Sequence, residues 1–177
     1  MHTFIKIIIL SIIMTSDSKL KPLTDLDVEI LGKLSEDGRL SLRQLAKDTE
    51  AGSPVTIKNH VDRLEKDGII KSYGAQIDYE KIGYDIIALI EITVSKGKML
   101  EVENKIAQNP NVFAVYDLTG TYDALILARF KTRKELSDMI KDEVHSSPYV
   151  ERTNTHIVLN IIKERSSFAE LLKKVGK

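Results

Sequence analysis

The sequence of 177 residues contains no cysteine and no tryptophan, and its 26 basic residues are balanced by 26 acidic ones. The lack of cysteine excludes disulfides and thiolate metal sites. The balanced charge excludes a general attraction to nucleic acid or to membranes, so DNA binding has to come from a local positive patch. A chain of this length is expected to form one large domain or two small ones.

Residues that would mark a metal, cofactor or catalytic site are also scarce. The four histidines are scattered without the spacing of metal ligands, so we expect no structural zinc or other metal. No phosphate-binding glycine loop and no nucleophile–base motif can be read in the sequence. We therefore expect no catalytic residues, no cofactor and no enzyme activity.

The first fourteen residues, MHTFIKIIILSIIM, are almost wholly apolar. A membrane-spanning helix needs about 20 apolar residues, so this run is too short and no membrane partner is expected. Lys6 interrupts the run and no small-residue cleavage site follows it, unlike in a secretory signal peptide. We interpret residues 1–21 as a leader, either an added element that packs on a partner or an artefact of an upstream start codon. We favour the artefact, with Met14 as the true first residue.

Three helices are predicted within residues 22–77. Apolar residues recur at helical spacing over 25–37, 42–48 and 54–67. Each predicted helix follows a residue type that caps helices, and the third also has a proline at its first position. These residues are Thr24, Ser41, Ser53 and Pro54. A short turn with Gly52 separates the second helix from the third, which is helix-turn-helix spacing.

The segment after the third helix is expected to form a wing. Two short strands, at 69–70 and 75–77, flank a turn at 72–74 and would complete a winged helix-turn-helix over 22–77. Residues 78–85 are predicted to be a linker, with Gly83 as its flexible point.

From residue 86 the pattern changes to strands alternating with helices. Helices are predicted at 100–108 and from 132 or 133 to about 144, and a short final helix at 167–174. Strands are predicted at 86–94, 112–118, 124–130 and 150–162. The order β-α-β-β-α-β is that of a ferredoxin-like domain, placed at 86–165 and followed by a tail at 166–177. The expected fold class is α+β.

The third helix is the candidate for reading DNA. Its apolar stripe leaves a polar outer face, and the N-terminal part of such a helix enters the major groove. Asn59 can pair with adenine and Lys58 with guanine, while methyl groups can touch thymine. Arg63 and Arg43 are placed for phosphates. The full set of candidate DNA-binding residues is Arg43, Ser53, Val55, Thr56, Lys58, Asn59 and Arg63.

The alternative is that this face is only solvated. Over residues 25–80 the acids number twelve and the bases eight, so the region is not basic as a whole. The acids, however, fall largely on the first helix and the C-terminal part of the third, away from the DNA-facing end. His60 neighbours the apolar stripe, and we interpret it as a partly buried structural residue.

A second candidate site is the turn between two predicted strands, at 119–123. Gly120 permits close backbone approach, and the neighbouring side chains offer oxygen atoms suited to the ammonium group of an amino acid. The candidate effector-binding residues are Thr119, Gly120, Thr121, Tyr122 and Asp123. On pattern alone, an ordinary hairpin turn explains these residues better.

Several blocks of sequence together resemble the Lrp/AsnC, or feast/famine, family of transcriptional regulators. In the first half these are DLDVEIL at 25–31, GRLS at 38–41, LA at 45–46 and SPVTIKNHVDRLEKDGII at 53–70. In the second half they are VYDLTGTYDAL at 115–125 and RTNTHIVL at 152–159. The resemblance covers about residues 22–165.

The resemblance implies a cytoplasmic regulator that binds specific sequences of double-stranded DNA. It implies that the domain at 86–165 dimerises through its sheet and binds a small-molecule effector, commonly an amino acid, near Gly120 and Asp123. Dimers in the family often associate into tetramers or octamers. Two alternatives stay open: an enzyme of tetrapyrrole decarboxylation, which shares the fold, and a metabolite sensor that acts without DNA.

Overall fold

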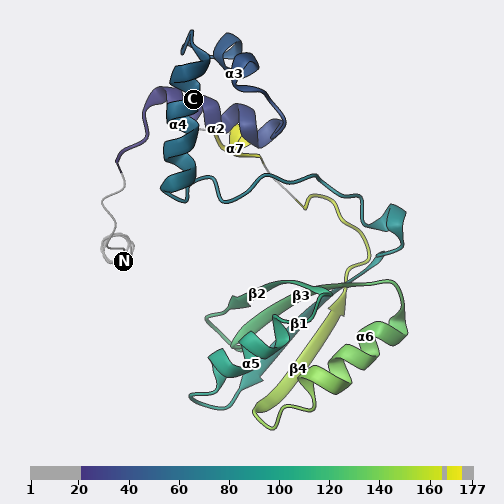
Figure 1. The fold of residues 1–177 in the computed structure, drawn as a ribbon. Coiled ribbons are helices and arrows are strands. Elements are labelled where there is room, and N and C mark those ends of the chain that lie inside the picture. Colours follow the sequence, from purple (N-terminus) through teal and green to yellow (C-terminus); the bar gives the residue numbers. More distant parts are fainter. Residues whose placement is uncertain (1–20, 165–166, 173–177) are drawn as a thin grey trace, which may run out of the picture. The chain divides into compact units, whose positions relative to one another are not determined.

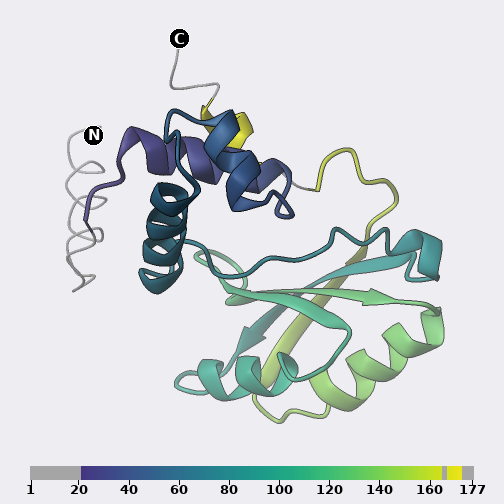
Figure 2. The ribbon, with the colours of Figure 1, turned by 45° about the horizontal axis from the view of Figure 1, so that its top comes forward.

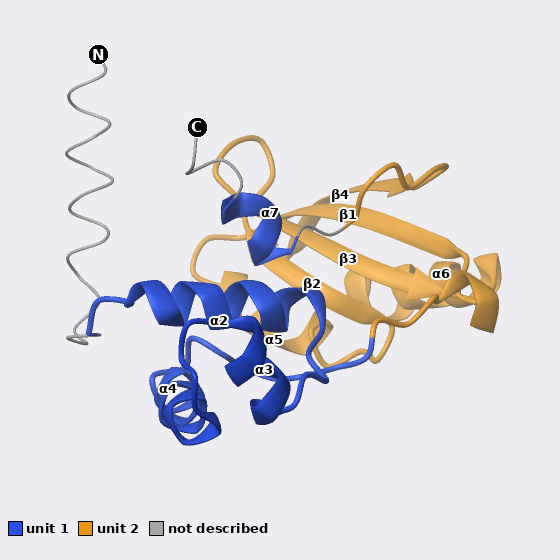
Figure 3. Ribbon diagram, turned by 90° about the horizontal axis from the view of Figure 1, so that it is seen from above, with its two compact units in different colours: residues 1–75, 165–177 blue, residues 76–164 orange. Residues whose placement is uncertain are grey.

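The computed structural model describes residues 21–164 and 167–172 of the chain. The predicted apolar leader, residues 1–21, therefore lies outside the described residues except for Lys21. The chain divides into two compact units, the first formed by residues 1–75 with 165–177 and the second by residues 76–164 (Figure 3).

The first unit is built from helices. They are α2 (Asp25–Glu36), α3 (Leu42–Asp48), α4 (Pro54–Lys66) and α7 (Phe168–Leu172). The predicted caps are confirmed: the side chains of Thr24, Ser41 and Ser53 accept the backbone N–H of Asp27, Gln44 and Val55. Each cap satisfies a donor that has no partner within its helix, which fixes where the helix starts.

The core of the first unit lies where α2, α3 and α4 meet (Figure 2). One apolar residue from α2, one from α3 and two from α4 are almost wholly buried there: Ile30, Leu45, Ile57 and Leu64. Because these positions recur at helical spacing, the three helices turn their opposite faces to solvent. The predicted helix-turn-helix is thus confirmed.

The predicted wing strands are not formed. Residues 69–78 contain no strand, and the backbone N–H groups of Ile69 and Ile70 donate to the carbonyl of Leu64 at 2.9 and 3.1 Å. Both isoleucines pack against the helical core. Their apolar side chains therefore complete the core of the helical unit. The backbone forms no ladder, because residues 69–78 contain no second strand to pair with.

The second unit is a four-stranded antiparallel sheet with helices on one face (Figure 1). Its elements are η1 (Glu80–Ile82), β1 (Ile86–Val94), α5 (Met99–Ile106), β2 (Val112–Asp117), β3 (Ala124–Phe130), α6 (Arg133–Met139), η2 (Ile140–Val144) and β4 (Val150–Ile157). The strand order β2-β3-β1-β4 and the β-α-β-β-α-β succession confirm the ferredoxin-like prediction.

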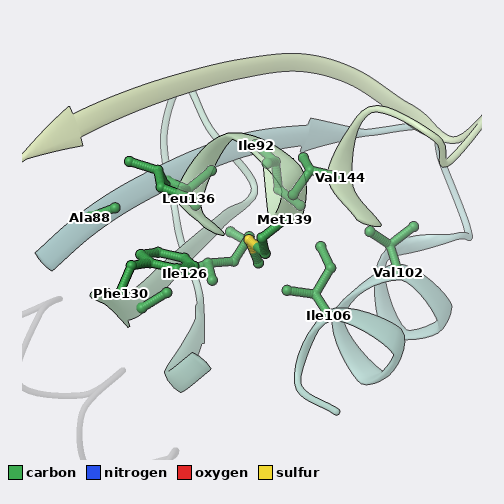
Figure 4. Packing of buried hydrophobic residues seen from close by; sticks show 12 residues of the cluster. Ala88, Ile92, Val102, Ile106, Ile126, Phe130, Leu136, Met139 and Val144 are labelled. Atoms are coloured by element: carbon green, nitrogen blue, oxygen red, sulfur yellow. The ribbon is translucent and has the colours of Figure 1, made fainter. Parts of the chain in front are cut away.

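Alternate residues of the two central strands build the core of this unit. Figure 4 shows side chains of β1 and β3 meeting those of α5, α6 and η2. The labelled members are Ala88, Ile92, Val102, Ile106, Ile126, Phe130, Leu136, Met139 and Val144. Because side chains of a strand alternate between faces, the intervening residues of β1 and β3 lie on the face without helices.

The last strand is shorter than predicted. Apolar residues continue to Ile162, but β4 ends at Ile157. β4 pairs only with β1, whose first residue is Ile86, and the N–H of Val158 makes a last bond to the carbonyl of Ile87 at 2.9 Å. Beyond this point no partner strand continues, so the ladder stops. Among the described residues, no helix is long and apolar enough to cross a membrane.

Candidate nucleic-acid interface and effector site

The outward face of α4 carries the residues predicted to read DNA. Val55 is 69% exposed, and Lys58 and Asn59 are also exposed. Thr56 is half-buried, and Lys58 forms an ion pair with Asp62 one turn further along the helix. An exposed pair of this kind contributes little stability, so the Lys58 ammonium group can change partners at low cost.

The C-terminal half of the same helix is tied to α2 by a buried carboxylate. Asp27 is completely buried, and its carboxylate contacts His60 Nδ1 at 2.7 Å and the guanidinium group of Arg63. The backbone N–H and the hydroxyl of Thr24 both donate to Asp27 Oδ2 at 2.7 Å. Asp27 therefore joins the start of α2 to two successive turns of α4.

The pKa of Asp27 reflects two opposing effects. Burial raises the pKa of the carboxyl group, but hydrogen bonds from Arg63, His60 and Thr24 lower it further, so the net pKa lies well below its ordinary value. The carboxylate is thus charged wherever the protein is folded at moderate pH. A buried charge is tolerated because donors surround it.

The structure assigns partners to two residues of the third helix. The interpretation of His60 as a partly buried structural residue agrees with its contact to Asp27. The Arg63 side chain, proposed for phosphate contact, is 25% exposed and pairs with Asp27. Sequence reasoning missed this pair because the two partners are far apart in the chain. Arg43 is exposed on α3, and Ser53 is the half-buried cap of α4.

The turn at 119–123 joins β2 to β3. Gly120 has φ +140°, a conformation that side chains disfavour, and no atom lies within 4 Å of the position that a Cβ would take. Thr119 and Thr121 are exposed, and Tyr122 is half-buried. The turn thus presents two hydroxyl groups beside an open stretch of backbone.

Asp123 anchors this turn to β1. Its carboxylate accepts the N–H of Val94 at 2.8 Å, its own N–H donates to the carbonyl of Ile92 at 2.9 Å, and its carbonyl accepts the N–H of Leu118 at 2.7 Å. Its carboxylate is therefore already engaged through one oxygen. The five predicted effector residues lie together, but their contact with an effector stays a prediction.

A carboxyl pair that was not predicted from the sequence joins α5 to the end of β2. Glu103 of α5 is 9% exposed and interacts with Asp117, the last residue of β2. Burial raises the pKa of Glu103 to about 7, and the hydrogen bond and negative charge of Asp117 act in the same direction. Glu103 directly follows Val102 and precedes Ile106 by about one turn, and both of these residues face the core. This position on α5 is the signal in the sequence that could have indicated its burial.

Metal binding finds no support in the described ranges, where no group of three or more His, Cys, Asp or Glu residues could hold an ion.

Comparison with known proteins assigns each unit to a family. Residues 23–71 match the family described as winged helix-turn-helix DNA-binding, and residues 87–168 match the Lrp/AsnC ligand binding domain. An uncharacterised HTH-type transcriptional regulator of Pyrococcus abyssi is 40% identical over 142 residues, which is 80% of this chain and 95% of the relative. The HTH-type transcriptional regulator FL11 of Pyrococcus furiosus is 39% identical over 142 residues, 80% and 93% of the two chains.

Solved structures show the same two-part architecture. AsnC of E. coli superposes with a TM-score of 0.76 at 26% identity, covering 83% of this chain and 99% of that one. A transcriptional regulator of Neisseria meningitidis in complex with L-Met superposes with a TM-score of 0.75 at 28% identity, covering 82% and 96%.

The Asp27 contacts predict a stability difference between two basic residues of α4. Arg63→Ala leaves the buried carboxylate with fewer donors, so we expect the free energy of unfolding to fall by roughly 2–4 kcal/mol. Lys58→Ala removes only an exposed pair and should change it by less than about 0.5 kcal/mol. Urea titration followed by circular dichroism measures both. Equal effects would show that the buried Asp27–Arg63 pair contributes no more to the free energy of unfolding than the exposed Lys58–Asp62 pair.

The raised pKa of Glu103 predicts a pH-dependent stability. The folded chain holds the Glu103 proton more tightly than the unfolded chain, whose pKa is near the ordinary 4.5. This stabilisation is complete below pH 4.5 and is lost as the pH rises through about 7. It amounts to at most about 3–4 kcal/mol, at about 1.4 kcal/mol per pKa unit for the rise from 4.5 to about 7.

We expect Glu103→Gln to remove this loss, so that urea titrations at pH 5 and pH 8 differ less than in the unaltered chain. Glu101→Gln, on the exposed side of the same helix, is the matched control and should keep the full pH dependence. An unchanged pH dependence in Glu103→Gln would contradict the assignment.

Proposed function

The chain belongs to the Lrp/AsnC family of helix-turn-helix transcriptional regulators, and from this we propose how it reads DNA and what controls it. The observation that carries the DNA proposal is the exposed N-terminal half of α4, where Val55, Lys58 and Asn59 project from a capped helix. A helix presented in this way enters the major groove with its first turns. The protein then acts on double-stranded DNA in the cytoplasm.

The burial pattern of α4 supports a division of labour along the helix. The end near Ser53 carries exposed polar side chains, whereas His60 and Arg63 are engaged by Asp27. Base contacts therefore fall to Lys58 and Asn59, and Arg43 remains exposed for a phosphate. In this arrangement Arg63 supports DNA binding chiefly by fixing α4 on α2.

Asn59 provides the sharpest test of base reading. DNA ligands are first enriched from a random pool with the full chain, and affinities are then measured by fluorescence anisotropy at fixed salt. Asn59→Ala should lose about 1–3 kcal/mol for the enriched site, about 5- to 150-fold, and little for unrelated DNA. Asn104→Ala, the same change at an exposed position of α5, is the control.

If no DNA sequence were enriched, the proposal that the chain binds specific DNA would be contradicted. A metabolite sensor that acts without DNA would then be favoured. If Asn59→Ala weakened all sequences equally, Asn59 would contact the backbone and not the bases. The curated relatives are named as regulators, and no observation at the site favours the tetrapyrrole decarboxylase alternative.

We propose an amino acid as the effector, bound at the turn of residues 119–123. The open backbone at Gly120 and the exposed hydroxyl groups of Thr119 and Thr121 suit the charged groups of an amino acid. The similar Neisseria protein was solved in complex with L-Met, which makes methionine the first compound to test.

Gly120→Ala tests this site against a matched glycine. Alanine at φ +140° is strained by about 1–3 kcal/mol, and its methyl group would occupy the open space of the turn. Gly97→Ala is the control, because Gly97 lies in another turn at φ +78° and also has no atom within 4 Å of an added Cβ. Calorimetric titration with a panel of amino acids should show weaker binding only for Gly120→Ala. Equal affinities would place the effector elsewhere.

We also propose that the helix-free face of the sheet forms the dimer interface. Leu89, Leu125 and Leu127 alternate with core residues, and Tyr116 on β2 is 54% exposed. Apolar side chains gathered on one sheet face favour burial against a second copy. We expect dimers, which can associate into tetramers or octamers.

Leu127→Glu places a charge on this face and should convert the assembly to monomers in light scattering at micromolar concentration. Leu159→Glu is the control, because Leu159 is 89% exposed and follows the end of β4. An unchanged mass for Leu127→Glu would move the interface to another surface.

A further inference from the structure

The C-terminal helix α7 packs along α2 of the helix-turn-helix (Figure 3). Its residues Phe168–Leu172 belong to the first unit, although they follow the last residues of the second unit in the chain. The chain therefore passes between the two units twice, once after Ala75 and once after Glu164.

Gly32 gives α7 the space to approach. It is a buried residue in the middle of α2, where glycine is a poor helix former, and its backbone does not adopt positive φ. The Cβ of any other residue would lie 3.2 Å from Leu172 Cδ1. The glycine is thus explained by close packing against α7 and not by backbone conformation.

Ser35 adds a polar contact one turn further along α2. Its Oγ accepts the backbone N–H of Ala169 at 3.2 Å and donates to the carbonyl of Gly32 at 2.7 Å. An N–H in the first turn of a helix has no partner within that helix, so Ser35 satisfies a donor of α7. Packing and hydrogen bonding therefore act on the same face of α2.

Phe168 lines an apolar cavity of about 480 Å³ in the first unit. The wall of the cavity includes Leu31 and Leu34 of α2 and Ile70 and Tyr73 after α4. The wall of the cavity is thus shared by α7 and by Ile70, which packs against the core where a wing strand was predicted. This links α7 to the segment that leads out of the helix-turn-helix.

At the other end of the tail, Arg129 holds the chain on the second unit. Its guanidinium group pairs with Glu164 and lies over the rings of Tyr79 and Phe113, at 4.4 and 4.2 Å from their centroids. Tyr79 belongs to the segment that enters this unit, and Glu164 is the last described residue before the tail leaves it. The side chain of Arg129 therefore contacts both segments that connect the two units.

We propose that the face of α2 around Gly32 and Ser35 is a docking surface for the C-terminal helix of the same chain. The docked tail is a second tether between the DNA-binding unit and the effector unit. Two connections restrict the movement of one unit against the other more than a single linker does. Together they close a loop of chain, and closing a loop reduces the conformations open to both connections.

Disulfide trapping tests the docking without background, because the chain has no cysteine of its own. Gly32→Cys combined with Leu172→Cys should cross-link under mild oxidation, giving a faster-migrating monomer on a non-reducing gel. Gly32→Cys with Leu171→Cys is the control, since Leu171 is 52% exposed. No cross-link in the first pair, or the same yield in both, would overturn the proposal. A cross-linked dimer would assign the helix to a second copy and also overturn it.

Hydrogen exchange provides a second measurement that needs no cysteine. Leu172→Ser should speed exchange of the Ala169 amide at least about tenfold, the change expected when a local opening becomes easier. Leu171→Ser should leave it unchanged. Equal exchange in both variants contradicts docking through Leu172.

The tether's effect on regulation rests on the proposed function. Effectors typically change affinity 5- to 150-fold in allosteric proteins, and we expect Leu172→Ser to reduce that factor by roughly threefold or more. Leu171→Ser should keep it. A full response in Leu172→Ser would show that the tether does not couple the units. If the unaltered chain bound no DNA, the proposed function would fail, and cross-linking would still decide the docking.

Discussion

The buried carboxylate of Asp27 is the interaction on which the DNA-binding unit depends. It accepts hydrogen bonds from Thr24 at the start of α2, and it contacts His60 and Arg63 on α4. An unpartnered charge in this position would be very costly, so the helices must stay where the donors reach it. The requirement holds α4 against α2 through His60 and Arg63, while Asn59, one turn before Arg63, stays exposed. The surface proposed to meet DNA therefore depends on a contact inside the unit.

Local features of the sequence predicted most of the fold because each has a local physical cause. The caps at Thr24, Ser41 and Ser53 marked three helix starts, and the strands predicted at 86–94 and 124–130 coincide with β1 and β3. The ends of elements that depend on a distant partner were predicted less well. β4 stops where β1 offers no further bonds, and the apolar residues up to Ile162 could not reveal this.

The candidate sites show the same limit more clearly. The exposed residues of α4 and the turn around Gly120 could be proposed as sites from their types and order. The Asp27–Arg63 pair and the Glu103–Asp117 pair could not, because each joins elements whose approach is decided by tertiary packing. Asp27 resembles an ordinary first-turn acid, and Glu103 an ordinary helix-surface acid. Their burial, and with it their shifted pKa values, follows only once the helices are packed.

Asp123 shows how an effector could influence more than its own site. Its carboxylate accepts the N–H of Val94, and its backbone is bonded to Ile92 and Leu118. A ligand ammonium group that recruits the carboxylate must either use its second oxygen or compete with Val94. The first choice stiffens the turn against β1, and the second releases it. A ligand shifts a conformational equilibrium only through such a difference in contacts, so an effector bound at the proposed site would act on the sheet through the shared carboxylate of Asp123.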